Sequence, residues 1–251
     1  MGDLRSALVD SMAGAPSALE AADRLCRACV DVLGVDGASI SVADGITTQG
    51  TFGSSGELSR RLDEYQFTFG EGPCLDAVRG GVPVIAADLS STTEDRWPAF
   101  RDAVLTAGIC AVFALPVGLQ ARPFGALDLF NRTRGELTDR ALSGGLVAAE
   151  LAAAPLLKMM GSAREMADSA EGELGWDQLA SLERVEVYQA TGMVIAALNV
   201  SPDDALIRLR AYAYAHGLTA SEAAWRVLDR EANLHDDGWG SGGRAGDDDR
   251  D

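Results

Sequence analysis

The pattern of apolar residues changes once along this chain of 251 residues, and the change limits the folds that the chain can adopt. Up to about residue 157, helical spacing alternates with short β-rich runs, whereas from Trp176 onward helical spacing alone remains. A chain of this length has room for two domains. The sequence therefore predicts an α+β domain followed by a small domain made of helices.

The first part contains five strand-like runs between helical segments. The runs are rich in β-branched and aromatic residues or alternate polar with apolar ones, and a turn such as Asp44-Gly45 separates them. They cover residues 38–43, 46–52, 82–86, 109–119 and 124–130. Helices are expected at residues 19–33, 56–66, 74–78 and 93–108, and again from about Arg140. This order predicts an antiparallel sheet with helices packed against it.

Three short helices are predicted in the second part. The first runs over residues 182–198, where apolar residues follow helical spacing. Ser201 caps the second helix, which has Pro202 in its first turn. Thr219 and Glu222 have the spacing of a capping box, which opens the third helix. These signals place a three-helix domain at the end of the folded chain.

Two features of these helices indicate a binding partner. Gly192 lies in the middle of an apolar helix, where glycine costs about 1 kcal/mol relative to alanine, so we expect another helix to pack closely there. The second helix has two apolar faces, and because one must serve the core, the other is available for a dimer mate or an unpaired base. The first face holds Ala205, Leu206, Leu209, Tyr212 and Ala213, and the second holds Ile207, Ala211 and Tyr214.

The charge balance limits how the chain can meet nucleic acid. It has 21 Lys and Arg against 38 Asp and Glu, a formal net charge of −17, which excludes broad electrostatic binding and leaves a local surface. Residues 234–251, rich in Gly and Asp, are expected to form a disordered acidic tail. Residues 1–15 are assigned to an N-terminal segment, and residues 158–178 to a helical connector.

The chain is expected to be cytoplasmic and to have no membrane partner. Its start lacks the basic region and the long apolar stretch of a signal peptide. The longest apolar segment, residues 142–160, contains Glu150, Pro155 and Lys158. No uninterrupted apolar run therefore reaches the roughly 18 residues that a membrane helix needs.

The cysteines and histidines predict neither a disulfide scaffold nor a metal site. Four cysteines are too few for a scaffold of this length, and the CxxC spacing of Cys26 and Cys29 has no second pair to complete a tetrahedral site. Both histidines, His216 and His235, lie in the second part, so the first part has no imidazole for haem. We expect no metal and no cofactor, and leave open an unidentified small ligand.

Several motifs of the first part resemble a GAF domain over residues 16–157, of the type common in actinobacterial regulators. They are GEGPC (70–74), Asp88, RWPAF (96–100), ALPV (114–117) and FGALDLFN (124–131). The resemblance implies a sensor pocket for a small ligand or a partner. Cys74 follows a glycine-rich turn at a helix start, where the pKa of a thiol is lowered, so a redox-sensitive or ligand-facing role stands beside a structural one. The residues expected to line the pocket are Gly70, Glu71, Cys74, Asp88, Trp97 and Phe100.

Residues 179–233 resemble an ANTAR domain. The matching residues are Arg184, QATG (189–192), SPDDAL (201–206), LRAYA (209–213) and SEAAWRVL (221–228). The resemblance implies a dimeric regulator without catalytic activity, whose helices bind hairpins of nascent leader RNA and so cause transcription antitermination in response to a signal. The residues expected to contact RNA are Arg184, Gln189, Thr191, Gly192, Arg210 and Tyr214.

Three alternatives stand beside this interpretation. The second and third helices could form a helix-turn-helix that binds DNA. The first domain could be an enzyme, a GAF-type free methionine sulfoxide reductase that uses Cys74 and Cys110. The helical domain could serve only for dimerisation or partner docking, because the family's lysine is absent from QATG and residues 182–230 carry five arginines against six acidic residues.

Overall fold

The computed structural model describes residues 2–43, 48–119, 122–167, 184–234 and 239. The chain forms two compact units, residues 1–184 and 185–251, which are described one at a time. The predicted order of an α+β domain and a helical domain is confirmed: the first unit has an antiparallel sheet with flanking helices, and the described residues of the second unit form helices and their connections.

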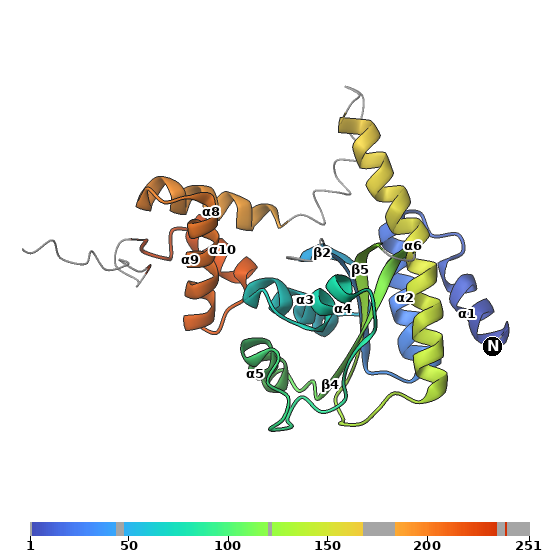
Figure 1. Ribbon diagram of the computed structural model, residues 1–251. Coiled ribbons are helices and arrows are strands. Elements are labelled where there is room, and N and C mark those ends of the chain that lie inside the picture. Colours follow the sequence, from blue (N-terminus) through green and yellow to red (C-terminus); the bar gives the residue numbers. More distant parts are fainter. Residues whose placement is uncertain (1, 44–47, 120–121, 168–183, 235–238, 240–251) are drawn as a thin grey trace, which may run out of the picture. The chain divides into compact units, whose positions relative to one another are not determined.

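The first unit is built on a five-stranded sheet in which every neighbouring pair of strands is antiparallel (Figure 1). The strand order is β2-β1-β5-β4-β3, so that β5 lies in the middle. The strands are β1 Gly37–Ala43, β2 Thr48–Ser54, β3 Val84–Ala86, β4 Ala111–Leu119 and β5 Arg122–Asn131. Strand β3 is shorter than predicted and begins after Pro83, which has no N–H to donate to a neighbouring strand.

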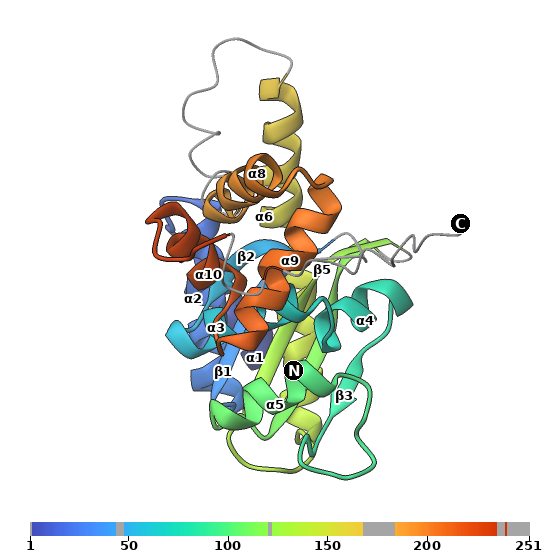
Figure 2. The same ribbon diagram turned by 90° about the vertical axis from the view of Figure 1, so that its left-hand side faces the viewer.

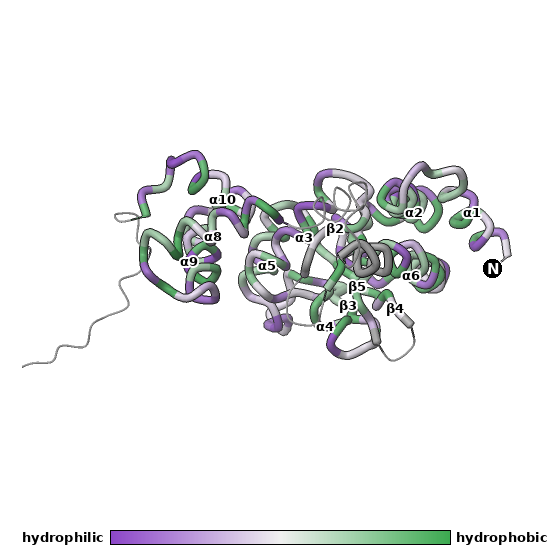
Figure 3. Tube along the Cα trace, turned by 90° about the horizontal axis from the view of Figure 1, so that it is seen from above, coloured by the Kyte–Doolittle hydropathy of each residue, from purple (hydrophilic) through white to green (hydrophobic). Residues whose placement is uncertain are grey.

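Helices cover both faces of this sheet. Seen from above, the strands lie between α2 and α6 on one side and α3 and α5 on the other (Figure 3), and the turned view shows α4 and α5 across the second face (Figure 2). Leu127 and Leu129 pack under α2 and α6, whereas the alternate residues Ala126 and Phe130 face the other helices. The helices are α1 Gly2–Met12, α2 Ala18–Leu33, α3 Glu57–Phe69, α4 Pro73–Gly80, α5 Pro98–Thr106 and α6 Asp139–Ala167.

The N-terminal segment forms a helix that belongs to the core. Leu4 and Leu8 of α1 are buried against α2 and α6. No helix is predicted from the sequence for residues 1–15, because two leucines four residues apart are a weak helical pattern. The described part of this segment therefore extends the hydrophobic core beyond residue 16 toward the N-terminus.

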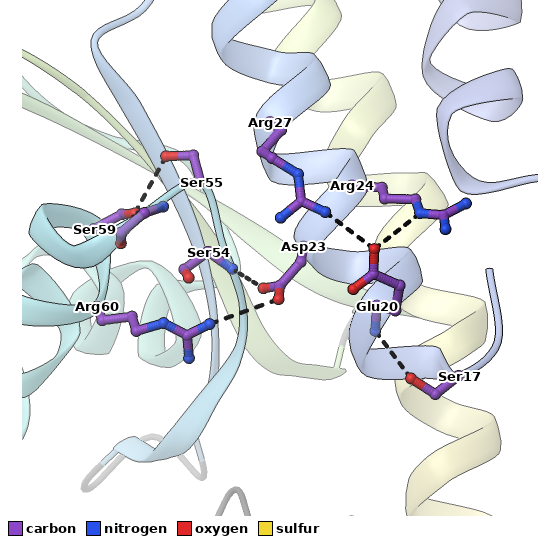
Figure 4. Close-up of polar contacts among 10 residues, drawn as sticks. Ser17, Glu20, Asp23, Arg24, Arg27, Ser54, Ser55, Ser59 and Arg60 are labelled. Atoms are coloured by element: carbon purple, nitrogen blue, oxygen red, sulfur yellow. Dashed lines mark hydrogen bonds and ion pairs between the residues drawn. The ribbon is translucent and has the colours of Figure 1, made fainter.

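Helix α2 is fixed at its start and joined to the opposite layer by polar contacts (Figure 4). The N–H of Glu20 donates to the hydroxyl of Ser17 at 3.1 Å, which caps the first turn. Asp23 accepts a hydrogen bond from the N–H of Ser54 at 2.7 Å and pairs with Arg60 of α3 at 3.6 Å. These contacts connect α2 to β2 and to α3.

Helix α6 lies against the sheet along its first half. By length and hydropathy alone, its Asp139–Met159 part is apolar enough to cross a membrane, but a core helix passes the same test. A Cβ at Gly145 would lie 2.6 Å from Leu115 Cδ1, so the glycine permits the helix to approach the sheet closely. Its inward side chains are those of Ala141, Ala148, Ala149, Ala152, Ala153, Leu156 and Met159.

Three helices form the second unit: α8 Val185–Leu198, α9 Pro202–Ala215 and α10 Ala220–Leu228. The predicted caps are confirmed, since the N–H of Asp204 donates to Ser201 Oγ and Thr219 and Glu222 form a reciprocal capping box. The core consists mainly of small or branched side chains, namely Val187, Ala190, Val194, Ala205, Leu209, Ala213, Ala220, Ala223, Ala224 and Val227.

The predicted connector and tail lie largely outside the described residues. Helix α6 continues to Ala167, and residues 168–183, 235–238 and 240–251 are not described. Trp239 is described and corrects the prediction of an entirely disordered tail, because only 5% of its surface is exposed. Its ring stacks on Tyr212 with centroids 4.8 Å apart, and its carbonyl accepts a hydrogen bond from Arg208.

The burial of α1 predicts a stability effect that an N-terminal segment outside the core would not give. Leu8→Ala removes a fully buried side chain and should lower the free energy of unfolding by about 2–4 kcal/mol. Val9→Ala, at a neighbouring position that is 44% exposed, is the matched control and should change it by less than about 0.5 kcal/mol. Denaturant unfolding followed by circular dichroism measures both, and equal effects would contradict the packing of α1.

Candidate functional site

A cluster of buried polar side chains lies between the sheet and helices α3 and α4. Strand alternation directs Ser39, Ser41 and Asp128 to this face, where helices cover them instead of solvent. Asp63 and Gln66 reach the same region from α3, and all five residues are fully buried. The set that we call the polar cluster consists of Ser39, Ser41, Asp63, Gln66, Cys74, Asp128 and Arg184.

The carboxylate of Asp63 is the centre of hydrogen bonding in the polar cluster. Its Oδ1 accepts from Ser41 Oγ at 2.6 Å, and its Oδ2 accepts from Thr51 Oγ1 and from Arg184 Nη2, both at 2.7 Å. A buried carboxylate without such partners costs several kcal/mol. The three donors replace the water that Asp63 has lost.

Arg184 fills the cluster from the end of the first unit. Its side chain is 6% exposed, its Nε donates to Glu64 Oε1 at 2.9 Å, and its Nη1 donates to the carbonyl of Thr48 at 3.3 Å. The guanidinium lies over the ring of Phe67, 4.0 Å from the centroid. Burial lowers the pKa of Arg184, but the carboxylates of Asp63 and Glu64 more than offset this, so the pKa is raised. The group is a permanently charged cation in this site.

Asp128 is the second buried carboxyl group of the cluster. Its Oδ2 accepts from Gln66 Nε2 at 2.7 Å, while its Oδ1 has no hydrogen-bond partner among the described residues. Burial raises the pKa of Asp128 to about 7, and the nearby charge of Asp63 acts in the same direction against the hydrogen bond from Gln66. Asp128 therefore changes protonation near neutral pH.

The glycine-rich turn before α4 makes room for Gln66. Gly70 ends α3 in the left-handed conformation, with φ of 66°. A Cβ at Gly72 would lie 2.5 Å from Gln66 Oε1, which accepts the N–H of Cys74 at 2.8 Å. The group that this glycine-rich turn approaches closely is therefore the side chain of Gln66.

Three of the predicted pocket residues join helices to one another. Glu71 Oε1 accepts the backbone N–H groups of Ala99 at 2.7 Å and Phe100 at 3.0 Å, so it caps the start of α5. Trp97 Nε1 donates to Asp76 of α4 at 2.9 Å, and its ring meets Phe100 edge to face. The contacts of Glu71, Trp97 and Phe100 are structural.

The other two predicted side chains also differ from the expectation. Asp88 is half-buried, accepts hydrogen bonds from Ser90 and pairs with Arg134 at 3.7 Å, and none of these polar partners is one of the other five predicted residues. Cys74 is fully buried, and burial raises the pKa of its thiol well above the usual range. The expected lowering at a helix start is therefore wrong, because desolvation of the thiolate exceeds the helix effect.

Sequence reasoning missed the residues at the centre of the polar cluster. Asp128 interrupts the apolar run FGALDLF, and Ser39 and Ser41 alternate with apolar residues in ASISVA. Those patterns are typical of a solvent-facing edge, and only the knowledge that helices cover both faces of the sheet turns them into a signal for a buried site. Among the residues that the structure describes, no group of three His, Cys, Asp or Glu side chains is placed to hold a metal ion.

One known protein family matches more than half of the chain. Residues 16–154 match the GAF domain family. The chain belongs to the GAF domain family. Membership agrees with the predicted resemblance of residues 16–157 and is consistent with a sensor role for the first unit, while residues 185–251 lie outside the match.

One solved structure supports the GAF fold, and two further structures align less closely. The GAF domain of a phosphoenolpyruvate-protein phosphotransferase from Coxiella burnetii aligns with a TM-score of 0.50 and 15% identity, over 64% of this chain and 95% of that one. The corresponding domain from Acinetobacter gives 0.49 and 14%, over 64% and 96%. A free methionine-R-sulfoxide reductase from Neisseria meningitidis gives 0.44 and 12%, over 62% and 85%. No curated protein matches the sequence.

Of the residues predicted to contact RNA, two are buried. Arg184 belongs to the polar cluster of the GAF unit, where its guanidinium is taken up by Asp63 and Glu64. Thr191 is 9% exposed and faces the core of the second unit, with its hydroxyl donating to the carbonyl of Val187 at 2.7 Å. Neither side chain is placed to contact RNA.

The remaining predicted RNA residues lie wholly or partly at the surface of the second unit. Gln189 and Gly192 of α8 are exposed, Tyr214 of α9 is 63% exposed, and Arg210 is half-buried. A Cβ built on Gly192 meets no atom within 4 Å, so the predicted packing of another helix against this glycine does not occur within the described chain. Its energetic cost is not recovered by any contact of the described residues.

The exposed residues of the second unit form two stripes, one on α8 and one on α9. The residues of the α8 stripe are separated by the helical spacing, and they include small, apolar and polar side chains. It consists of Val185, Tyr188, Gln189, Gly192 and Ala196. The α9 stripe is the second apolar face predicted for that helix, and the burial of Ala205, Leu209, Tyr212 and Ala213 on the first face confirms the division. It consists of Ile207, Ala211 and Tyr214.

The raised pKa of Asp128 predicts a pH-dependent difference between the parent chain and Asp128→Asn. Between pH 4 and 7 the folded state holds a proton that the unfolded state releases, so the contribution of Asp128 to stability falls as pH rises and is constant above about pH 7. Asparagine cannot ionise. Relative to the parent, the variant should gain about 2–3 kcal/mol between pH 4.5 and 8.

Urea unfolding at the two pH values measures this difference. Any constant cost of placing an amide beside Gln66 cancels when the two pH values are compared. Asp102→Asn, at a side chain that is 72% exposed, is the control for removing one carboxylate at the surface. An unchanged difference between Asp128→Asn and the parent across the pH range would contradict a protonated Asp128.

Proposed function

We propose that this protein is a signal-responsive transcription regulator, in which the GAF domain senses a small ligand or partner and the three helices bind hairpins of nascent RNA in the manner of an ANTAR domain. Binding would favour one hairpin and thereby prevent a terminator from forming. The proposal also holds that the protein acts as a homodimer in the cytoplasm and has no enzymatic activity. The observation that carries it is the exposed α8 stripe around Gly192.

The α8 stripe has the features of a contact surface. Gly192 costs about 1 kcal/mol in a helix interior, and its open side is matched to a partner that approaches the backbone closely. Tyr188 is 60% exposed on the same stripe, and Gln189 beside it offers amide donors and acceptors. An aromatic ring, an amide and an open backbone together suit an RNA loop, whose unstacked bases require stacking and hydrogen bonding.

The α9 stripe adds a second aromatic ring. Tyr214 is exposed, and the helical period places Arg208 and Arg210 on either side of the α9 stripe. Stacking of a base on an aromatic ring contributes about 1–3 kcal/mol without requiring a high positive charge. Stacking therefore supports RNA recognition by a helical unit in which residues 185–234 carry four arginines against six acidic residues, in a chain with a net charge of −17.

The resemblance of residues 179–233 to an ANTAR domain supports the same output. With Arg184 and Thr191 buried, the proposed RNA surface consists of Gln189, Gly192, Arg210 and Tyr214, to which we add Tyr188. The buried, high-pKa thiol of Cys74 gives no support to the alternative of a thiol-dependent reductase.

A gel shift with the full chain tests the proposal. The probes are a leader RNA with two adjacent hairpins, the same RNA with one hairpin, and duplex DNA of the same sequence. We expect binding to the paired hairpins that weakens from about 50 to about 200 mM salt. Equal binding to the duplex would favour a helix-turn-helix output, and no RNA binding at low salt would contradict the proposal.

Substitution of Tyr214 tests base stacking directly. Tyr214→Ala should weaken RNA binding about tenfold. Loss of one stacked base costs about 1–3 kcal/mol, and about 1.4 kcal/mol corresponds to a tenfold change in affinity. Tyr214→Phe is the matched control and should retain the affinity, since the ring remains. Equal losses in the two variants would assign the contact to the hydroxyl, and no loss in either would remove Tyr214 from the surface.

Substitution of Gly192 separates folding from partner binding. Gly192→Ala meets no steric obstacle and should raise the free energy of unfolding of the helical unit by about 0.5–1 kcal/mol, because alanine is the better helix former. The added methyl group should at the same time weaken RNA binding by hindering close approach. Thermal unfolding and filter binding measure the two effects, and unchanged RNA affinity would show that the open side of Gly192 is not a contact.

A further inference from the structure

We propose that the region around Asp63 is a binding site for a guanidinium or alkylammonium ligand, and that Arg184 occupies this site as a built-in substitute. The inference rests on the proposed sensor role of the GAF domain and gives the ligand of that sensor a chemical class. It is carried by the complete set of contacts that one guanidinium makes with groups of the GAF fold.

The contacts of Arg184 match those that a free guanidinium would need. Three of its nitrogens donate to three different acceptors, the carboxylates of Asp63 and Glu64 and the carbonyl of Thr48. The ring of Phe67 covers one face of the planar group. Planar, bidentate-capable donors and a stacked ring are the recognition mode of guanidinium, and a primary ammonium satisfies part of it.

The carboxylate of Asp63, the central acceptor of the site, is held by the GAF fold as well as by Arg184. Ser41 on β1 and Thr51 on β2 hold both oxygens of Asp63 through their hydroxyl groups, at 2.6 and 2.7 Å. These strands are neighbours in the sheet, and Asp63 comes from α3 above them. The carboxylate is therefore preorganised toward whatever cation lies beside it.

A cation suits the site because removal of Arg184 leaves the buried carboxylate of Asp63 with two hydroxyl donors and no positive charge beside it. Asp63 is fully buried, and an unpaired buried carboxylate is strongly unfavourable. A second acceptor lies close by, since Asp128 is near enough to Asp63 to feel its charge and its Oδ1 has no partner among the described residues. The site thus selects positive charge.

Arg184 is placed in the chain so that its displacement has a consequence. It lies 120 residues from Glu64 in sequence, belongs to no helix or strand, and is the last residue of the first unit. The next residue, Val185, begins α8. A ligand that replaces Arg184 would free the residue at which the chain enters the helical unit, without removing a residue from any element of the GAF fold.

A tethered arginine competes strongly with a free cation, so the test removes its side chain. Binding of a tethered group acts at an effective concentration of about millimolar. Arg184→Ala in the full chain leaves a space for the lost atoms, which are those of ethylguanidinium. We use ethylguanidinium chloride as the probe, with ethylurea as its neutral, planar counterpart and sodium chloride as the ionic-strength control.

The readouts are the midpoint of thermal unfolding and isothermal titration calorimetry. Arg184→Ala should unfold at a lower temperature than the parent, and about 20 mM ethylguanidinium should raise its midpoint by about 5 °C in a saturable manner. The parent should show a smaller rise at the same concentration, because the probe has to displace the tethered side chain of Arg184. The double variant Arg184→Ala, Asp63→Asn should show none, because it lacks the carboxylate.

Two results would overturn the proposal: a rise with ethylguanidinium in Arg184→Ala that does not exceed the rise with ethylurea, or an equal rise in the double variant. If Arg184→Ala does not fold, Arg184→Met retains most of the aliphatic stem and leaves the guanidinium position over Phe67 open to the free guanidinium ion, which then serves as probe with the same criteria. No RNA is present in these measurements, so their failure is distinguishable from failure of the RNA-binding proposal.

Discussion

Compensation of buried charge is the constraint on which the first unit depends. A sheet with helices on both faces has no side on which a polar residue escapes burial, so Asp63 and Asp128 require partners from within the protein. Two solutions occur side by side. Asp63 is held by hydroxyl groups and by the guanidinium of Arg184, whereas the pKa of Asp128 is raised to about 7. The hydrophobic layers surround this polar centre.

The elements and their faces could be predicted because local signals determine them. Ser201 and Thr219 cap their helices as their spacing indicates, and the two faces of α9 separate into buried and exposed residues as the helical period requires. The GAF motifs likewise identify the family of the first unit. Such signals act over a few residues or over one helix, which is why a single sequence contains them.

The candidate site could not be predicted in the same way, because its residues are far apart in the chain. Arg184 meets Glu64 across 120 residues, and no local pattern in either segment records that pairing. Thr191 is predicted to lie on the RNA surface, but in the structure it faces the core of the helical unit. Its hydroxyl donates to the carbonyl of Val187. Cys74 shows the same limit, since burial by distant strands exceeds the effect of its own helix.

The stacking of Trp239 on Tyr212 has a practical consequence for the extent of the helical unit. Trp239 follows a polar segment that is not expected to fold. Its indole nevertheless covers one side of the Tyr212 ring, which the three helices alone would leave exposed. A chain trimmed after the last helix would therefore carry a bare aromatic surface and be prone to self-association. The natural C-terminal limit of this unit lies at or beyond Trp239.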